Sequence, residues 1–137
     1  MTPILHWVIE NRLARGRRPG YAGERGALVP QAEVDNWIGE VNSLGVRSII
    51  CLLARDQLKW YADLPADLIS YYRAAGFTVA HIPALDHQDP PLTDQHLERI
   101  WEAYQTLTKP VLVHCSAGID RTGRAVEYIT RRLGATC

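Results

Sequence analysis

Hydrophobic residues along the chain follow two spacings, which predict strands alternating with helices. The stretches 48–53 and 110–113 are almost continuously apolar, as is typical of strands buried on both faces of a sheet. In the segment 31–44 apolar residues instead recur as they do on one face of a helix. Further strands are predicted at 5–9, 13–14 and 77–82, and further helices from about 65 to 76, after Thr93, and from 124 to 133.

The order of these elements predicts an α/β fold in one domain that spans residues 1–137. Strands that alternate with helices at this spacing favour a mostly parallel central sheet, flanked by helices on both faces. In such sheets, ligands bind beyond the carboxyl ends of the strands. We therefore expect the loops after the predicted strands 77–82 and 111–113 to open onto the same edge of the sheet.

The segment that follows the last predicted strand carries the candidate chemistry. It reads His-Cys-Ser-Ala-Gly-Ile-Asp-Arg-Thr-Gly from His114 to Gly123 and leads into a helical pattern. A cysteine at the end of a strand, a short loop and an arginine at the start of a helix form a cradle for an anion. Loop N–H groups and the positive helix end both favour bound phosphate. The same field favours a thiolate over a neutral thiol, which would make Cys115 nucleophilic.

The residues of this segment have separate predicted roles. Cys115 is the candidate nucleophile that attacks phosphorus, and Arg121 chelates two phosphoryl oxygens in a bidentate geometry. The Thr122 hydroxyl is placed to donate a hydrogen bond to the departing thiolate. The other phosphate donors are backbone N–H groups in a chain that a glycine allows to curl tightly, those of Ser116, Ala117, Gly118, Ile119, Asp120 and Arg121.

The extended pattern His-Cys-x2-Gly-x2-Arg-Thr-Gly resembles the signature of the cysteine-dependent protein tyrosine phosphatase superfamily. The order of the preceding elements is most similar to the small dual-specificity branch. The resemblance implies that His114 holds the loop from behind, and that a general acid lies in a Pro-x-x-Asp-x-x-x-Pro segment. Residues 83–90 match that layout at Asp86. Asp89 competes for the same role, and its alternative interpretation is a turn residue held by two prolines.

The predicted function is metal-independent hydrolysis of phosphomonoesters through a cysteinyl-phosphate intermediate, as in protein tyrosine and dual-specificity phosphatases. Phosphotyrosine or another aryl phosphate is the leading substrate, with phosphoserine, phosphothreonine and phosphoinositides left open. Asp120 is common in lipid-acting relatives, whereas the additional loop lysine of those relatives is replaced here by Ile119. A catalytically weak, phosphate-binding pseudophosphatase and an RNA 5′-phosphatase are further alternatives.

Composition argues against several other classes. Lys+Arg and Asp+Glu balance at 15 each, so no basic field predicts nucleic-acid binding, and the expected partner is a phosphorylated protein or small phosphomonoester. No segment predicts a signal peptide or a membrane span, so the three cysteines indicate thiols in a reducing, cytoplasmic compartment. The histidines lack zinc-like spacing, so neither a metal nor a cofactor is expected. A monomer is the default expectation.

Three remaining features carry expectations of their own. A cluster of arginines is interpreted as a solvated loop, with help in the approach of an anionic substrate as the alternative: Arg12, Arg15, Arg17 and Arg18. Cys51 is either a small apolar core residue or, by resemblance to some relatives, a thiol that bridges the nucleophile under oxidation. The chain is short after the catalytic helix, which predicts either modest stability or cover by a partner.

Overall fold

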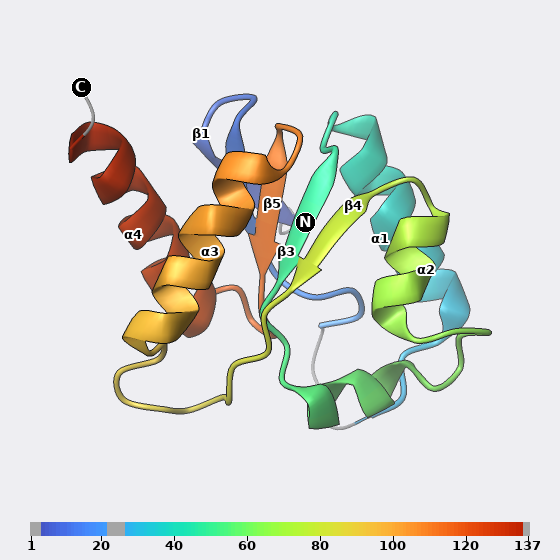
Figure 1. The fold of residues 1–137 in the computed structure, drawn as a ribbon. Helices are drawn as coiled ribbons and strands as arrows, with labels where there is room; N and C mark the ends of the chain where they lie inside the picture. The colour runs from blue at the N-terminus through green and yellow to red at the C-terminus, as the bar shows by residue number, and fades with distance from the viewer. Residues whose placement is uncertain (1–3, 22–26, 136–137) are drawn as a thin grey trace.

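The computed structural model describes residues 4–21 and 27–135, and these form a five-stranded sheet with helices on its faces (Figure 1). The strands lie in the order β1-β2-β5-β3-β4 across the sheet. β1 is antiparallel to β2, and every other pair is parallel. The strands are β1 (Leu5–Ile9), β2 (Leu13–Gly16), β3 (Ser48–Cys51), β4 (Thr78–His81) and β5 (Val111–His114). The predicted α/β fold with a mostly parallel sheet is confirmed.

Two hydrophobic clusters lie on the two faces of this sheet. Helices α1 (Gln31–Ser43) and α2 (Leu68–Ala74) cover one face, and α3 (Asp94–Thr106) and α4 (Asp120–Ala135) cover the other (Figure 1). The first cluster contains Val34, Trp37, Leu68 and Tyr72, and the second contains Ile100, Trp101, Val126 and Ile129. A 3-10 helix, η1 (Arg55–Tyr61), follows β3. Because both faces are covered, the interior strands β3 and β5 are almost continuously apolar, as the sequence pattern indicated, with Ser48 and His114 as buried polar exceptions.

Capping side chains set where α2 and α3 begin. The Thr93 hydroxyl accepts a hydrogen bond from the His96 N–H at 3.2 Å, which confirms the predicted cap of α3. The prediction for α2 was wrong at its start, because the helix begins at Leu68 rather than near Pro65. The Asp67 carboxylate accepts from the Ser70 N–H at 2.9 Å, and this charged cap stabilises a later start.

Helix α4 is attached to α3 by a charged and aromatic cluster on the surface. Glu98 accepts hydrogen bonds from the Tyr128 hydroxyl at 2.6 Å and from the Arg132 guanidinium at 2.9 Å. The same guanidinium lies 5.0 Å from the centre of the Trp101 ring. Together with the buried face of α4, these contacts hold the last described helix against the sheet and α3.

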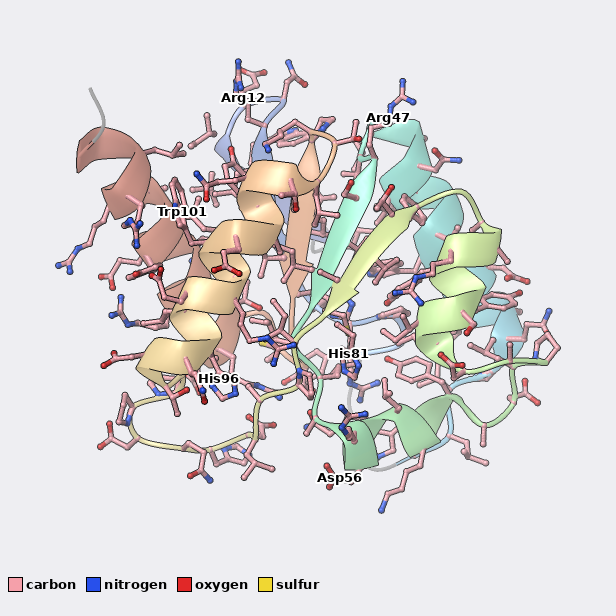
Figure 2. The ribbon with its side chains drawn as sticks, viewed as in Figure 1. Arg12, Arg47, Asp56, His81, His96 and Trp101 are labelled. Carbon is pink, nitrogen blue, oxygen red and sulfur yellow. The ribbon has the colours of Figure 1, made fainter. Side chains whose placement is uncertain are left out.

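The two ends of the sheet carry different loops. Arg12 and Arg47, which precede β2 and β3, lie at one end, while Asp56 and His96 lie at the other (Figure 2). The second end is the one at which the four parallel strands finish. None of the described helices combines the length and apolar composition that crossing a membrane requires.

Candidate active site

Each of the four parallel strands delivers a polar residue to the same edge of the sheet. Arg18 follows β2, Gln57 lies in η1 after β3, Asp86 follows β4, and the segment from Cys115 follows β5. Because parallel strands finish at one edge, residues distant in the sequence meet there. The predicted meeting of the Asp86 loop with the catalytic loop is found in the structure, through a contact between Asp86 and Arg121.

The carbonyl groups of the loop after β5 are bound from its outer side. Hydrogen bonds of 2.9–3.3 Å run from His114 Nδ1 to the Cys115 carbonyl, from the Arg18 N–H to that of Ser116, and from Arg15 to those of Gly118 and Ile119. In a planar trans peptide the N–H points away from the carbonyl of the same unit. The N–H groups that follow these four carbonyls therefore point to the inner side of the loop.

These inward N–H groups have no acceptor of their own. None of the backbone N–H groups from Ser116 to Arg121 donates to another residue in the described part of the chain. Several neighbouring N–H groups without acceptors favour a bound anion, so this loop is a site for an acceptor with several oxygens. Phosphate meets that requirement, and the N-terminus of α4 adds its positive dipole end.

Close contact between two backbones explains the glycine in the middle of the loop. Gly118 has a φ of 78°, in the left-handed region, and a Cβ placed there would lie 2.4 Å from the Gly16 carbonyl oxygen. Any side chain at Gly118 would therefore push the loop away from β2. The loop curls tightly because it rests directly on the end of the neighbouring strand.

Arg121 is buried, and part of its guanidinium has no hydrogen-bond partner. Nη1 donates to the Leu52 carbonyl at 3.3 Å, the Gln57 amide oxygen at 2.9 Å and the Ala84 carbonyl at 2.8 Å. Nε and Nη2 make no hydrogen bond with the described residues, although Nη2 lies 3.3 Å from an Asp86 carboxylate oxygen. The first nitrogen anchors the side chain, and the other two form the fork that suits two phosphoryl oxygens.

Asp86 rather than Asp89 reaches this arginine. Besides the ion pair with Arg121, the Asp86 carboxylate accepts from the Gln57 side chain at 3.2 Å and from the His87 N–H at 3.0 Å. Its side chain is 19% exposed, so it is open to a substrate as well as to the protein. Asp89 is exposed on the same loop. The structure thus brings the first of the two candidate acids to the site.

His114 lies behind the loop as a neutral side chain. Burial lowers the pKa of its imidazole to about 4. Its Nδ1 faces the Cys115 carbonyl, which only accepts, so Nδ1 carries the proton and Nε2 accepts from the Tyr72 hydroxyl at 2.9 Å. The edge of the ring also packs against Trp37, with 5.5 Å between the ring centres. These contacts put the histidine where the resemblance implies, holding the loop from behind.

The profile of the family described as "Polymorphic toxin system, DSP-PTPase phosphatase" matches residues 31–135. The chain belongs to this family. The structural likeness extends to a wider set of phosphatases, since 34 chains of solved structures match significantly. No curated protein matches the sequence significantly.

Three of these solved structures illustrate the range of phosphatases that the fold resembles. The active form of Tk-PTP is 24% identical, over 98% of this chain and 77% of that chain, with a TM-score of 0.62. Kinase associated phosphatase, with its catalytic site cysteine substituted by serine, is 19% identical over 88% and 65%, with a TM-score of 0.67. PTPMT1 in complex with PI(5)P is 18% identical over 94% and 83%, with a TM-score of 0.57. These structural similarities show that this chain has the same fold as the three phosphatases.

The prediction of a solvated arginine loop was wrong for two of its four members. Arg18 is 2% exposed, lies 4.3 Å from the centre of the Trp60 ring, and donates to the Ser116 hydroxyl at 3.1 Å. Arg15 binds loop carbonyls, as described above. A planar guanidinium both stacks on an aromatic ring and donates in its own plane, which is why it is buried here rather than solvated.

Two other predicted side-chain contacts are not made in the structure. The Thr122 hydroxyl is buried and has no hydrogen-bond partner among the described residues, so its predicted bond to Cys115 is not made. Cys51 and Cys115 are both free thiols and belong to different hydrophobic clusters. Burial raises the pKa of the Cys51 thiol to about 12. Within residues 4–21 and 27–135, no three His, Cys, Asp or Glu side chains gather in a group that could hold a metal ion.

Sequence reasoning missed three side chains of this phosphatase. Tyr72 and Gln57 were given no role at the site, and Arg18 was placed in a solvated loop, with help in the approach of an anionic substrate as the alternative. No motif marks them. The signal that was available for Gln57 is its place directly after a buried parallel strand, which directs a residue to the carboxyl edge.

Proposed function

We propose that this phosphatase hydrolyses phosphomonoesters through a cysteinyl-phosphate intermediate, with residues 1–137 as one catalytic domain. The observation that carries the proposal is the set of donors without partners in the segment that starts at Cys115. The backbone N–H groups of this loop have no acceptor, and neither do two buried nitrogens of Arg121 at the start of α4. These donors match a phosphoryl group, whose charge spreads over several oxygens in the transition state.

In the first step the Cys115 thiolate forms a bond to phosphorus while the bond to the ester oxygen breaks. Asp86 gives its proton to the leaving oxygen, which departs as a phenol or alcohol. In the second step Asp86 takes a proton from water, the water oxygen binds phosphorus, and the thiolate departs with inorganic phosphate as the product. Arg121 and the backbone N–H groups stabilise the phosphoryl charge in both steps. Thr122 would donate to the departing sulfur after rotation of its hydroxyl.

Exposed aliphatic side chains at the rim favour an aryl phosphate such as phosphotyrosine. Leu85, next to the proposed acid, is 64% exposed, and Ile119, in the loop, is 65% exposed. Such exposure of large apolar side chains on either side of a polar site suits an aromatic ring. We therefore propose a phosphotyrosine protein or another aryl phosphate as the substrate, and the family description suggests that it is met within a polymorphic toxin system.

A phosphoinositide is the second candidate substrate, because a cavity of about 350 Å³ beside the loop has a cationic lining. Its cationic lining residues are Arg15 and Arg17, which lie there together with Ala117 and Ile119 of the loop. The similar PTPMT1 structure contains PI(5)P. An additional phosphate on the substrate would meet these cations, whereas a single aryl phosphate would not need them.

The decisive experiment is hydrolysis of a substrate panel in the presence of a chelator. The panel contains phenyl phosphate, phosphotyrosine and phosphoserine peptides, phosphoinositides and a 5′-phosphorylated RNA. We expect the wild-type protein to release phosphate fastest from the aryl substrates. Cys115→Ser should release none, although it should still bind substrate. A protein that binds phosphotyrosine peptide without turnover would be a pseudophosphatase, and loss of activity on chelation would contradict the proposed mechanism.

The proposed acid is tested by a matched pair of substitutions. Asp86→Asn should lower kcat by roughly 10²–10⁴ toward phenyl phosphate, because the leaving phenoxide then lacks a proton donor. Asp89→Asn, three residues further along the same exposed loop, should leave kcat within about twofold. Inhibition by inorganic phosphate should be similar in both variants. The reverse ranking of the two variants would assign the acid to Asp89.

A further inference from the structure

The Gln57 side chain lies between the proposed acid and the phosphate-binding arginine. Its amide oxygen accepts from Arg121 Nη1 at 2.9 Å and from the Ala54 N–H at 2.9 Å. Its amide nitrogen donates to the Asp86 carboxylate at 3.2 Å. The residue is 6% exposed, so these are the partners on which its buried amide depends.

The three partners determine which way the amide points. Two of them, Arg121 and Ala54, only donate, and the third is a carboxylate, which accepts. A rotation of the amide by 180° would set its NH2 group against two donors and its oxygen against a carboxylate oxygen. The orientation with the donor toward Asp86 is therefore the one that satisfies all three contacts.

Gln57 is attached to a buried part of the fold. Its bond to the buried Ala54 N–H ties the side chain to the start of η1, three residues after the end of the interior strand β3. Asp86, in contrast, lies on a loop whose flanking residues Leu85 and His87 are exposed. A bond from Gln57 thus holds a carboxylate on an open loop to the folded body of the protein.

Arg121 depends less on Gln57 than Asp86 does. Without the glutamine, Nη1 would still have the carbonyl groups of Leu52 and Ala84 as acceptors. Asp86 accepts from Gln57 and, within its own loop, from the His87 N–H, while its ion pair with Arg121 uses a guanidinium nitrogen that phosphate would also use. The loss of Gln57 should therefore affect the acid more than the phosphate-binding fork.

We propose that Gln57 is a positioning residue that holds Asp86 over the phosphate-binding loop, so that its proton reaches the leaving oxygen. This inference rests on the proposed function of Asp86 as the general acid. It predicts that Gln57 matters in proportion to how much the leaving group needs a proton. A residue with a merely structural role would lower the rate for every substrate equally.

The test is kcat for a series of aryl phosphates whose leaving phenols range from weakly to strongly acidic, measured on Gln57→Glu. This variant keeps an oxygen that accepts from Arg121 and Ala54, replaces the donor that faces Asp86, and adds a negative charge beside both residues. We expect kcat to fall about 100-fold for phenyl phosphate, whose leaving group needs the acid, and less than threefold for dinitrophenyl phosphate. Inhibition by inorganic phosphate should change less than threefold in Gln57→Ala, which adds no charge beside Arg121.

Two controls keep the result interpretable. Gln88→Ala, on the exposed acid loop, should leave the whole series unchanged. Gln57→Glu combined with Asp86→Asn should lose no more than Asp86→Asn alone, since a positioned acid is then already absent. Gln57→Ala is measured beside Gln57→Glu on the same series, because it removes the donor to Asp86 with no new charge, although the acceptor for Arg121 and Ala54 is lost as well.

The outcomes separate this inference from the proposed function. An equal loss of kcat across the series, or no loss toward phenyl phosphate, would overturn the role of Gln57 while the wild-type protein remains an active phosphatase. A wild-type protein that hydrolyses no aryl phosphate would instead overturn the proposed function itself.

Discussion

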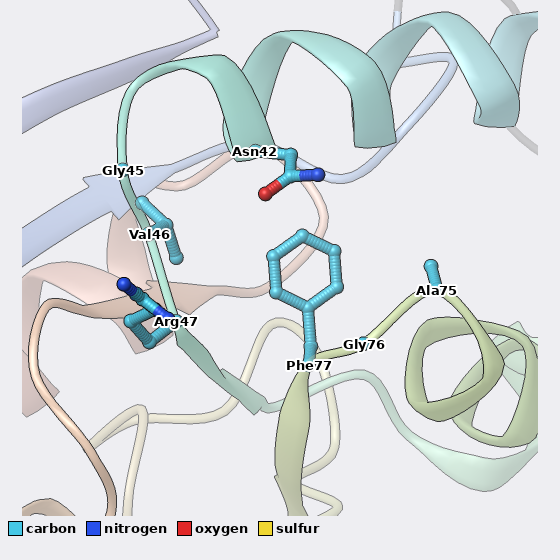
Figure 3. A pocket seen from close by; sticks show the side chains of 7 residues that line it. All are labelled: Asn42, Gly45, Val46, Arg47, Ala75, Gly76 and Phe77. Carbon is cyan, nitrogen blue, oxygen red and sulfur yellow. The ribbon is translucent and has the colours of Figure 1, made fainter.

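Two cavities of nearly equal volume lie at opposite edges of the sheet. The cavity at the carboxyl edge, about 350 Å³, adjoins the loop of Cys115. The cavity at the amino edge, about 360 Å³, lies where β3 and β4 begin, and it is lined by Asn42, Gly45, Val46, Arg47, Ala75, Gly76 and Phe77 (Figure 3). Cavity size does not distinguish the two edges of the sheet, but the polar groups at each edge do.

At the amino edge the polar groups are satisfied or exposed. Helices α1 and α2 end there, and backbone bonds of 3.0 Å from Gly45 and Gly76 close their last turns. Arg47 is exposed to solvent. At the carboxyl edge the N-terminus of α4 meets buried cations and donors without partners. Helix C-termini attract cations and N-termini attract anions, so only the carboxyl edge is built for phosphate.

The largest difference in activity between the two edges is expected when a glycine at each edge is replaced by alanine. Gly118→Ala should lower kcat/KM on the order of 10²-fold or more, because its Cβ would lie 2.4 Å from the Gly16 carbonyl and displace the loop. Gly76→Ala has open space and only the backbone strain of a φ of 104°, so it should cost about 1–2 kcal/mol of stability. Initial rates and urea unfolding measure both effects. Similar activity losses would mean that the loop geometry is not special.

Buried His114 should make stability depend on pH. Its pKa is about 4 in the folded protein, against the ordinary histidine value of 6.5 in the unfolded chain. The unfolded chain therefore binds the extra proton between pH 6.5 and 4, and about 3 kcal/mol of stability is lost as the pH falls through that range. Urea unfolding of the wild type and of His114→Gln should differ in slope with pH, whereas exposed His87→Gln should follow the wild type. Parallel slopes for all three would contradict a neutral histidine behind the loop.

The next largest difference is expected between substitutions of Arg18, at the carboxyl edge, and of Arg47, at the amino edge. Arg18→Met removes a buried guanidinium from Ser116 and Tyr61, so we expect a loss of about 2 kcal/mol in stability and about tenfold in kcat/KM. Arg47→Met should change stability by less than about 0.5 kcal/mol, since that side chain is exposed. Arg18→Lys keeps the charge but not the planar fork, and it should restore little. Full activity of Arg18→Met would show that the loop holds its shape without it.

The smallest effect is expected at Cys51. With a pKa raised to about 12, its thiol is rarely ionised, and it packs in the cluster under α1 and α2 rather than with Cys115. Cys51→Ala should change activity by less than about twofold, and its stability by about 1 kcal/mol. Mass spectrometry after peroxide treatment should find Cys115 oxidised and Cys51 intact. A reducible bond between the two cysteines would instead establish the protective role that the resemblance implied.

The sequence by itself determined the sheet, the loop after β5 and the two residues central to its chemistry, Cys115 and Arg121. Apolar runs and helical spacings are local patterns, and they placed the strands, the helices on both faces and the cap at Thr93 within a few positions. The segment from His114 to Gly123 carries its chemistry in consecutive residues, so its N–H groups, cysteine and arginine follow from the printed order.

Only the tertiary structure decided which distant side chains support that loop. Arg18 and Gln57 follow two different strands, and no spacing along the chain relates them to Cys115, whereas Asp86 was already expected there from the Pro-x-x-Asp-x-x-x-Pro layout. Parallel pairing of β2, β5, β3 and β4 brings their ends to one edge, where burial turns an arginine predicted to be solvated into a loop partner. A local pattern cannot contain that information, because which polar group faces which donor depends on how whole strands pair and pack.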